Sequence, residues 1–530
     1  MKKRVDFILH HAKIYTVDQN FSQCEAMAIS NGKIRATGSN ISILDQYEAP
    51  KMHDAKGYPV YPGFIDAHAH FYFYGQSLQA TELKDTKSWQ EVLEKVHIFS
   101  KKNNIEWIQG RGWDQNLWDT PRLPDNQKLN QLFPDKPVFL IRVDEHAAIA
   151  NQKALDIAGI KAETIVEGGE VQLKNGKPTG ILLDNAINLI KEKIPVPTLS
   201  EKQKCLLDAQ ENCFAVGLTT IDDCGLDREM IEFIAYLQKE GILKMRLNIM
   251  ISDKQENYDY YLQKGPYKTD FLNINSFKLF SDGALGSRGA CMLKDYVDRP
   301  GWNGFFLNEP SHFEETALRL ANSEFQMCTH AIGDAANRMV LQAYAKALKG
   351  QKNRHWRIEH AQFVHKDDLH FFRDYQIIPS VQPTHATTDM HWAEERLGKE
   401  RTSGIKHSKT YAYAYKTLLQ QNGWLPLGTD FPVEDINPMT TFYAAVTRQD
   451  KKGYPQNGFL PEEALSREEA LRGMTIWPAR LNFEEEEKGS LEPGKFADFV
   501  IMNKDIMEVD IKDTLKAQVK ATFLGGIRVF

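Results

Sequence analysis

The chain has 530 residues, of which 42% are hydrophobic, 26% charged and 11% aromatic. This composition is typical of a globular protein with a large core, and it excludes a disordered, collagen-like or disulfide-scaffold chain. The 65 basic and 71 acidic side chains leave a formal charge of −6, which gives no electrostatic reason to expect a nucleic-acid or anionic-membrane partner.

The first 18 residues contain only a short apolar run, interrupted by His10 and His11. Such a run indicates a strand and not a secretory signal, and no later stretch approaches the roughly 18 apolar residues of a membrane helix. The six cysteines form no Cys-x-x-Cys pair, which is typical of reduced thiols. We therefore expect a cytoplasmic protein without a nucleic-acid or membrane partner.

Both ends of the chain have the composition of short antiparallel strands. Near the N-terminus, Asn31-Gly32 is a hairpin signal, because both residues tolerate the positive φ of a type I′ turn. Gly525-Gly526 marks a turn near the C-terminus. Since the ends of a domain often lie close together, we expect residues 1–58 and 485–530 to form one composite β-sandwich.

Between these ends, strand-like runs alternate with segments of helical spacing, as in βα units around a parallel sheet. Eight runs have the composition of core strands, namely 60–70, 218–225, 245–252, 276–283, 326–334, 355–362, 377–385 and 424–433. They predict an α/β fold, a (β/α)₈ TIM barrel formed by residues 59–74 and 201–484. Active sites of such barrels lie at the C-terminal ends of the strands.

Residues 75–200 separate the first two predicted barrel strands. They are too long for a βα loop, so we expect an inserted subdomain. The segment has strand-like runs of its own, and Asn175-Gly176 is another hairpin signal. Because the insertion follows the first barrel strand, we expect it to cap the active site.

Metal-binding side chains fall at the ends of several predicted barrel strands. His68 and His70 end the first strand, and side chains at i and i+2 point to the same face, as a metal chelate requires. Two ordinary polar residues at a strand end would explain this pair equally well. His330, His360 and Asp430 end the fifth, sixth and eighth strands, and a shared edge favours a site for a divalent ion such as zinc.

Lys278, on the fourth predicted strand, does not fit this set in its usual charged form. A protonated lysine would be repelled by two cations, so it lies elsewhere, is neutralised, or is converted to a carbamate whose oxygens bridge two metals. An ion pair of Lys278 with Asp282 or another acid explains the residue as well.

Longer motifs resemble those of a known family. PGFIDAHAH, together with His330, His360, Asp430 and the late segment GSLEPGKFADFVIMN, is similar to the metal-dependent amidohydrolase superfamily. RGWDQN, HAAIAN, FKLFSDGALGSR, HAIGDAAN, IEHAQ and SVQPTH resemble more narrowly the amidohydrolase-3 type, the group of YtcJ-like proteins and N-substituted formamide deformylases. The resemblance extends over nearly the whole chain.

The resemblance implies a role for each matched residue. One metal would be held by His68 and His70 with Asp430, a second by His330 and His360, and carboxylated Lys278 would bridge them. The substrate pocket would be lined by Trp113, Asp114, His146, Arg288 and His385. Each of these five can equally be a structural residue of a loop. Relatives also suggest a homodimer.

The activity implied is hydrolysis of a C–N bond other than a peptide bond, in an N-acyl or N-formyl small molecule. An activated hydroxide would attack the carbonyl, and Asp430 would take the water proton and pass it to the leaving amine. Three alternatives stay open: a mononuclear deaminase of the same superfamily, a hydrolase of esters, lactones or organophosphates, and a non-catalytic scaffold.

Overall fold

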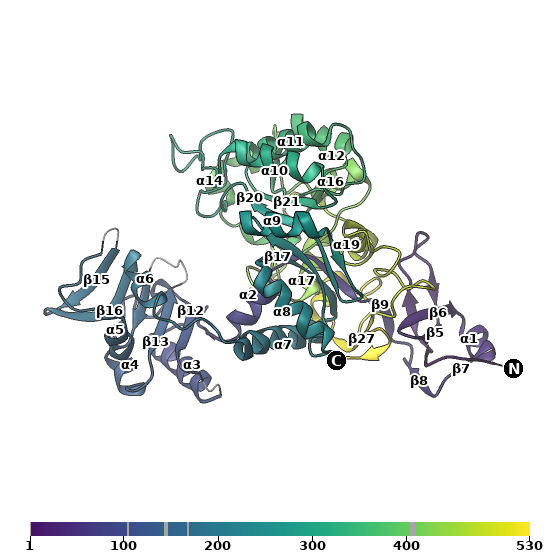
Figure 1. The fold of residues 1–530 in the computed structure, drawn as a ribbon, viewed down its shortest axis with the longest axis horizontal. Helices are drawn as coiled ribbons and strands as arrows, with labels where there is room; N and C mark the ends of the chain where they lie inside the picture. The colour runs from purple at the N-terminus through teal and green to yellow at the C-terminus, as the bar shows by residue number, and fades with distance from the viewer. Residues whose placement is uncertain (1, 103–104, 143–146, 167–168, 403–408) are drawn as a thin grey trace. The chain divides into compact units, whose positions relative to one another are not determined.

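A computed structural model describes residues 2–102, 105–142, 147–166, 169–402 and 409–530. The chain divides into two compact units, which we describe separately (Figure 1). The first unit comprises Met1–Phe71 and Gln210–Phe530, and the second comprises Tyr72–Ala209. Among the described residues, no helix combines the length and the hydropathy needed to cross a membrane.

The first unit contains a nearly closed barrel of seven parallel strands. In spatial order they are β10 (Phe64–Ala69), β17 (Leu218–Leu226), β18 (Arg246–Ser252), β20 (Leu272–Phe280), β21 (Gln326–Ala331), β22 (Arg357–His360) and β24 (Ile378–Ser380). The short strand β19 (Tyr267–Lys268) pairs antiparallel with β20. Nearly every residue of these seven strands is buried, as expected for a parallel sheet that is covered on both faces.

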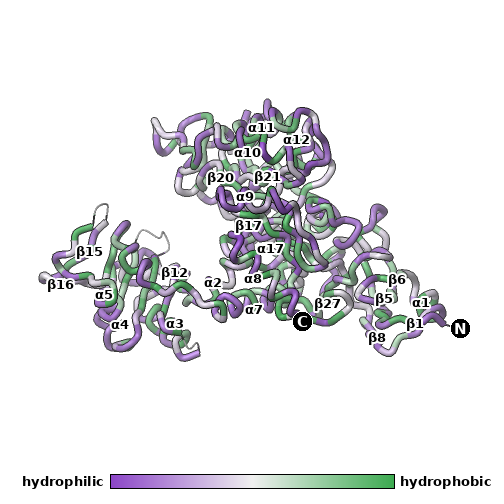
Figure 2. Tube along the Cα trace, in the orientation of Figure 1, coloured by the Kyte–Doolittle hydropathy of each residue, from purple (hydrophilic) through white to green (hydrophobic). Residues whose placement is uncertain are grey.

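Helices alternate with the barrel strands and pack one face against them. In chain order the first unit contains α1 (Asn40–Gln46), α8 (Arg228–Lys239), α9 (Gln255–Lys264), α10 (Pro310–Ala321), α11 (Asp334–Leu348), α12 (Leu369–Tyr375), α13 (Pro383–Asp389), α14 (Ala393–Leu397), α15 (Lys399–Thr402), α16 (Tyr415–Asn422), α17 (Pro438–Thr447), α18 (Arg467–Gly473) and α19 (Ile476–Leu481). Hydrophobic and hydrophilic residues alternate along α11 and α12 (Figure 2), which is the pattern of helices with one buried face.

The eighth predicted strand, 424–433, closes the barrel without forming a regular strand. Its one ladder bridge is the parallel pair Val381 and Leu427. Leu427 also accepts a hydrogen bond from the Ala67 N–H of β10 (3.2 Å). The prediction of a full strand is wrong because the segment contains prolines at 426 and 432, which cannot donate to a ladder, and because Asp430 has a positive φ of 63°.

Gly428 explains how closely this closing segment approaches β10. A Cβ atom at this position would lie 2.6 Å from the His68 nitrogen and 2.9 Å from Asp66 Oδ1. Asp66 fixes the same approach, because its carboxylate accepts hydrogen bonds from the Thr429 N–H (3.0 Å) and the Thr429 hydroxyl (2.6 Å). Burial raises the pKa of Asp66 to about 7, against the opposing effect of these hydrogen bonds.

Two other predicted barrel strands have different limits in the structure. The run 60–70 contains two strands, β9 (Pro59–Pro62) in a terminal sheet and β10 in the barrel. The run 377–385 ends as a strand at Ser380, and Pro383 begins helix α13. Proline suits the first turn of a helix because its fixed φ is helical and its missing N–H has no partner there.

Strands from both ends of the chain share one sheet. Its order is β28 (Ile527–Arg528), β27 (Val519–Leu524), β26 (Phe499–Met502), β9, β3 (Lys13–Tyr15) and β4 (Gln23–Cys24). A second sheet has the order β6 (Lys33–Gly38), β5 (Ala26–Ser30), β2 (Phe7–His10) and β8 (Lys51–Asp54). One apolar cluster includes buried residues of both sheets, among them Leu9, Ile29, Phe499 and Phe523.

The predicted hairpin turns are confirmed. Between β5 and β6, Asn31 and Gly32 have φ values of 52° and 74°. Gly525 and Gly526, between β27 and β28, are likewise in the left-handed region, with φ values of 55° and 73°. Short paired strands complete the first unit, β1 (Lys3–Arg4) with β7 (Tyr47–Glu48) and β23 (Phe363–His365) with β25 (Thr410–Ala412).

The second unit has a mixed sheet and apolar clusters of its own. The sheet order is β11 (Thr81–Glu82), β12 (Ile108–Trp113), β13 (Val138–Arg142), β14 (Ala147–Ala150), β16 (Lys177–Asp184) and β15 (Gly169–Lys174). The helices of this part of the chain are α2 (Phe71–Ser77), α3 (Trp89–Lys102), α4 (Gln127–Leu132), α5 (Gln152–Ala158), α6 (Asn188–Lys191) and α7 (Leu199–Ala215). The β15–β16 hairpin turns at Asn175 and Gly176, with φ values of 52° and 71°, as predicted.

A charged network joins the two ends of the chain. The Asp505 carboxylate accepts hydrogen bonds from the hydroxyls of Tyr15 (2.9 Å) and Tyr61 (2.9 Å) and pairs with the Lys13 ammonium (2.8 Å). Lys13 also pairs with Glu508, whose side chain is 66% exposed. Burial opposes ionisation of Asp505, but the hydrogen bonds from Lys13 and Tyr15 outweigh it and lower the pKa of this carboxyl.

We expect Asp505→Asn to lower the free energy of unfolding at pH 7 by about 1.5–3 kcal/mol, the range for hydrogen bonds to a charged group. A carboxyl whose folded pKa is depressed contributes stability that is complete above the unfolded value of 3.8 and is lost as the pH falls through the folded pKa. Urea unfolding between pH 3 and pH 7 should therefore show the two proteins converging at low pH. Glu508→Gln, the exposed control, should change little, and a gap that does not narrow between pH 7 and pH 3 would contradict this role.

Candidate metal centre

The predicted metal-binding residues lie at the C-terminal ends of the barrel strands. His68 is in β10 and His70 follows that strand, Lys278 is in β20, His330 is in β21, His360 ends β22, and Asp430 is in the closing segment. His68, Lys278, His360 and Asp430 are each at most 6% exposed. The structure thus brings all six residues to one end of the barrel.

Asp430 is surrounded by imidazole rings. Its Oδ1 lies 3.2 Å from His70 Nε2 and 3.7 Å from His68 Nε2. Its Oδ2 lies 3.5 Å from Nε2 of His385, in helix α13. Burial alone would raise the pKa of Asp430, but the contact with His70 and the interactions with His68 and His385 outweigh burial and lower it well below its usual range.

A compact group within this cluster has ligand atoms close enough to share one ion. His68, His360 and Asp430 each place one ligand atom within 4.8 Å of the other two. The ring of His360 lies 4.7 Å from that of His68 and 4.5 Å from that of His330, measured between centroids. His330 therefore extends the group along the same edge of the barrel.

Hydrogen bonds at Nδ1 determine the tautomer of three imidazoles in the cluster and leave the lone pair of each ring on Nε2. The Nδ1–H of His68 donates to Glu359 Oε2 (2.5 Å), and the Nδ1–H of His360 donates to Gln382 Oε1 (2.7 Å). The Nδ1–H of His70 donates to the Cys224 carbonyl (3.2 Å). A neutral imidazole that donates at Nδ1 carries its lone pair at Nε2, which is the tautomer that metal-binding histidines use.

His385 differs from these three histidines. Its Nδ1 accepts a hydrogen bond from the Gln362 side-chain amide (3.0 Å), so its Nε2 carries the proton. That N–H points at Asp430 Oδ2 without forming a hydrogen bond of standard geometry. His385 is therefore a hydrogen-bond donor at the edge of the cluster and not a metal ligand in this tautomer.

The electrostatics of the site favour neutral imidazoles. Burial, followed by the charge of Lys278, lowers the pKa of His330 to about 3 and holds the pKa of His68 well below its ordinary value. Burial lowers the pKa of His360 in the same way. Neutral imidazoles and one ionised carboxylate are the donor set that zinc and similar divalent ions use.

Several polar atoms of the cluster are buried without a hydrogen-bond partner. They are Nε2 of His330, Nε2 of His385 and Oδ1 of Asp430. Buried polar atoms are normally hydrogen-bonded, and orphaned ones call for an unplaced ligand or ion. Nε2 of His330 and Oδ1 of Asp430, with the donor set above, fit a divalent metal ion, whereas Nε2 of His385 carries a proton and is not a ligand atom.

Lys278 is buried against the cluster. Its Nζ lies 3.3 Å from His68 Nε2 and 4.9 Å from the centre of the Phe280 ring. The predicted alternative, an ion pair with Asp282, is not present among the described contacts. Asp282 instead accepts hydrogen bonds from the backbone N–H groups of Ile332, Gly333 and Cys291.

The structure adds positioning residues that the sequence analysis missed. Glu359 orients His68 and faces the guanidinium of Arg357, with Oε1 3.7 Å from Nε. Arg357 is fully buried and donates to Asp222 Oδ2 (2.9 Å), which continues this line of polar groups through the barrel interior. Arg357 and Glu359 are charged residues two positions apart in a short buried strand, and that pattern could have identified them.

Other predicted pocket residues have structural partners outside the cluster. Arg288 forms a bidentate pair with Asp298 (3.0 and 2.6 Å). In the second unit, Trp113 is fully buried in an apolar cluster and donates from its indole N–H to the Leu140 carbonyl (2.9 Å), so its side chain is not available to a ligand. Asp114 pairs with Arg142 (2.5 Å). His146 lies outside the described residues.

The chain matches the model of a known family, described as "Amidohydrolase family", over residues 51–530. Its curated relatives include the protein LONG AFTER FAR-RED 3 of Arabidopsis thaliana, which is 32% identical over 99% of this chain and 91% of its own. YtcJ of Bacillus subtilis is 30% identical over 99% of both chains. N-substituted formamide deformylase of Arthrobacter pascens is 26% identical over 99% of this chain and 98% of its own.

Solved structures share the fold. The crystal structure of an uncharacterized metal-dependent hydrolase from Pyrococcus horikoshii superposes with a TM-score of 0.79 at 28% identity. It covers 95% of this chain and 99% of its own. The predicted resemblance to the amidohydrolase-3 type is therefore confirmed along the whole chain.

We expect Glu359→Gln to reduce metal affinity by about 10- to 100-fold, the usual effect of removing a partner that orients a ligand imidazole. An amide can still accept from His68 Nδ1–H, so the ring should stay in place while the charge that strengthens its lone pair is lost. Competition with a chromogenic chelator measures the affinity. Glu395→Gln, at an exposed acid, is the matched control, and equal affinities in both variants would contradict the role of Glu359.

Proposed function

Since the chain belongs to the amidohydrolase family and is a metal-dependent hydrolase, we propose that it cleaves a carbon–nitrogen bond of the amide type in a small N-acyl or N-formyl compound. One observation carries this proposal: three imidazoles in the ligand tautomer face one ionised carboxylate at the mouth of the barrel. The likeness to an N-substituted formamide deformylase over nearly all of both chains supports the choice of bond.

We assign the metal-holding role to the six residues of the cluster. His68, His360 and Asp430 would hold one ion, and His70 and His330 extend the same donor set. A bound divalent ion supplies Lewis-acid polarisation of the substrate carbonyl and lowers the pKa of water. Lys278 would contribute a ligand only as a carbamate, because an ammonium 3.3 Å from His68 Nε2 competes with a cation for the same lone pair.

Asp430 would move the proton. Its low pKa keeps the carboxylate ionised at neutral pH, and Oδ1 is buried without a hydrogen bond. The carboxylate would accept the proton of the attacking water and pass it to the leaving nitrogen, which must be protonated because an amide anion is a poor leaving group. His385, with its Nε2–H directed at Asp430 Oδ2, would orient this carboxylate or bind the substrate.

The terminal segments would support the barrel from outside the site. We assign residues 1–58 and 485–530 to a composite β-sandwich, and the support for it is the sheet that both ends share. A buried pair connects this region to the barrel strand β18, because Arg246 contacts both carboxylate oxygens of Asp498 (2.6 and 3.0 Å).

The test is a screen of N-acyl and N-formyl compounds, with matched esters, on zinc- or manganese-loaded protein. We expect turnover of an N-acyl or N-formyl compound, and we expect Asp430→Asn to reduce kcat by at least about 100-fold, the lower range for loss of general acid–base catalysis. Metal content, measured in parallel, should stay within twofold of that of the wild type.

Asp367→Asn is the matched control, because Asp367 is an exposed carboxylate that also lies beside a histidine (3.5 Å from His365 Nδ1). It should leave kcat unchanged. If Asp430→Asn kept activity within a few-fold of the wild type, Asp430 would not be the proton carrier. If kcat/KM were higher for the esters than for the matched amides, the protein would be an ester hydrolase and the proposal of a C–N bond would be wrong.

Metal analysis tests the role of Lys278. We expect two ions per chain in protein prepared with bicarbonate and one ion in Lys278→Met, which keeps the length of the side chain but cannot form a carbamate. Elemental analysis of both proteins gives the counts. One ion in the wild type and one in Lys278→Met would favour the mononuclear deaminase type of site instead.

A further inference from the structure

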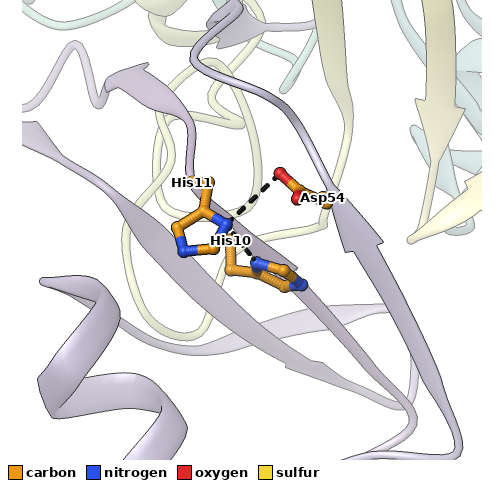
Figure 3. Close-up of side chains that lie close together, drawn as sticks. All are labelled: His10, His11 and Asp54. Carbon is orange, nitrogen blue, oxygen red and sulfur yellow. Dashed lines mark hydrogen bonds and ion pairs between the residues drawn. The ribbon is translucent and has the colours of Figure 1, made fainter.

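A second group of metal-binding side chains lies in the sheet formed by β6, β5, β2 and β8, separate from the barrel strands. His10 ends β2, Asp54 ends β8, and the two parallel strands pair with His10 opposite Asp54. His11 follows β2 directly. Figure 3 shows the two imidazoles and the carboxylate gathered at the ends of these strands.

The spacing of the ligand atoms is that of a chelate. Nδ1 of His10 lies 3.1 Å from Nδ1 of His11, which in turn lies 3.3 Å from Asp54 Oδ1. One ligand atom from each of the three residues lies within 4.8 Å of the other two. Nitrogen and oxygen ligands about 2.0–2.2 Å from a tetrahedral zinc ion are about 3.3–3.5 Å apart, so the three side chains need little adjustment to bind one ion.

The backbone holds His11 in this position. Its φ of 50° is in the left-handed region, which histidine adopts more readily than most residues. Its N–H donates to Asn40 Oδ1 (2.7 Å), and its carbonyl accepts from the Gly57 N–H (2.6 Å). These two hydrogen bonds hold the backbone that carries the His11 side chain beside Asp54.

A single proton arrangement does not give every close contact among these three groups a hydrogen bond. A neutral imidazole has one N–H and one lone pair, so a proton on His11 Nδ1 must be shared between His10 and Asp54. Protonating both rings places two cations side by side. The Asp54 carboxylate also accepts a hydrogen bond from the Lys56 N–H (2.8 Å) through Oδ1.

We propose that His10, His11 and Asp54 bind one divalent transition-metal ion, such as zinc, nickel or copper. Two imidazoles and a carboxylate favour these ions over calcium or magnesium. The side chains of His11 and Asp54 are 52% and 48% exposed, which leaves positions for water around the ion. The site is distinct from the barrel cluster and independent of the hydrolytic activity proposed above.

A bound ion would connect the ends of β2 and β8 to the segment that leads into β3. It would link β2 and β8, which pair in parallel, and the connection from His11 to β3, which belongs to the sheet shared by both ends of the chain. The ion would therefore act as a clamp at the edge of the terminal sheets and would take no part in hydrolysis.

Copper(II) titration of the zinc-loaded wild-type protein, followed by electron paramagnetic resonance, tests the proposal. We expect one copper ion per chain with nitrogen coupling from two imidazoles. His11→Asn and Asp54→Asn should each weaken this binding at least tenfold. Asparagine suits both positions, because it tolerates the left-handed backbone at residue 11 and has the shape of aspartate at residue 54.

His53→Gln is the matched control. His53 neighbours Asp54 on β8, but its ring packs against Phe523, 5.9 Å between centroids. This variant should bind copper as the wild type does, and zinc in the barrel should stay constant in all variants. Unchanged copper affinity in Asp54→Asn, equal loss in His53→Gln, or a spectrum without nitrogen coupling would each overturn the site.

Discussion

The arrangement of the barrel interior follows from the need to compensate buried charge. Arg357 lies at the centre with no exposed surface, contacting Asp222 on one side and Glu359 on the other. Isolated ions at such depth are costly, so this guanidinium and the carboxylates depend on one another. Glu359 in turn accepts the Nδ1–H of His68, so the orientation of this imidazole depends on an ion pair deep in the barrel. The site and the core are thus one electrostatic system.

Much of the architecture could be predicted because it rests on local patterns. The alternation of apolar runs and amphipathic segments indicated the parallel barrel, and Asn-Gly pairs marked two hairpins with the backbone conformation that they have. The predicted ends of two barrel strands were less accurate, and each contains a proline. Pro383 begins a helix where a strand was predicted to continue, and Pro426 lacks the N–H that a regular strand would donate. The contact between the closing segment and β10 likewise depends on a single residue, because only a glycine at position 428 lets the two backbones come so close.

For the site, the sequence predicted the residues that the structure brings together as candidate ligands, and it missed the residues that orient them. His68 and His360 occur at or near strand ends and Asp430 in the closing segment, where position along the chain determines place in the barrel. Gln382 and Gln362 act through hydrogen bonds between neighbouring elements, and such contacts have no signal in sequence spacing. The structure adds partners for two predicted pocket residues that the motifs did not indicate: the Trp113 indole is packed and hydrogen-bonded, and the Arg288 guanidinium is paired with Asp298.

The contact between Asp430 and the first barrel strand has a consequence for how the protein is made. The Asp430 N–H donates to the His68 carbonyl, so β10 has its neighbour on this side only after the chain has been synthesised to residue 430. Ribosomes add about 5–20 residues per second, so His68 and His70 are on the nascent chain for roughly 20–70 seconds before Asp430 is added. During that interval the early histidines are synthesised without the carboxylate that faces them in the folded barrel, so the cluster is completed only late in synthesis.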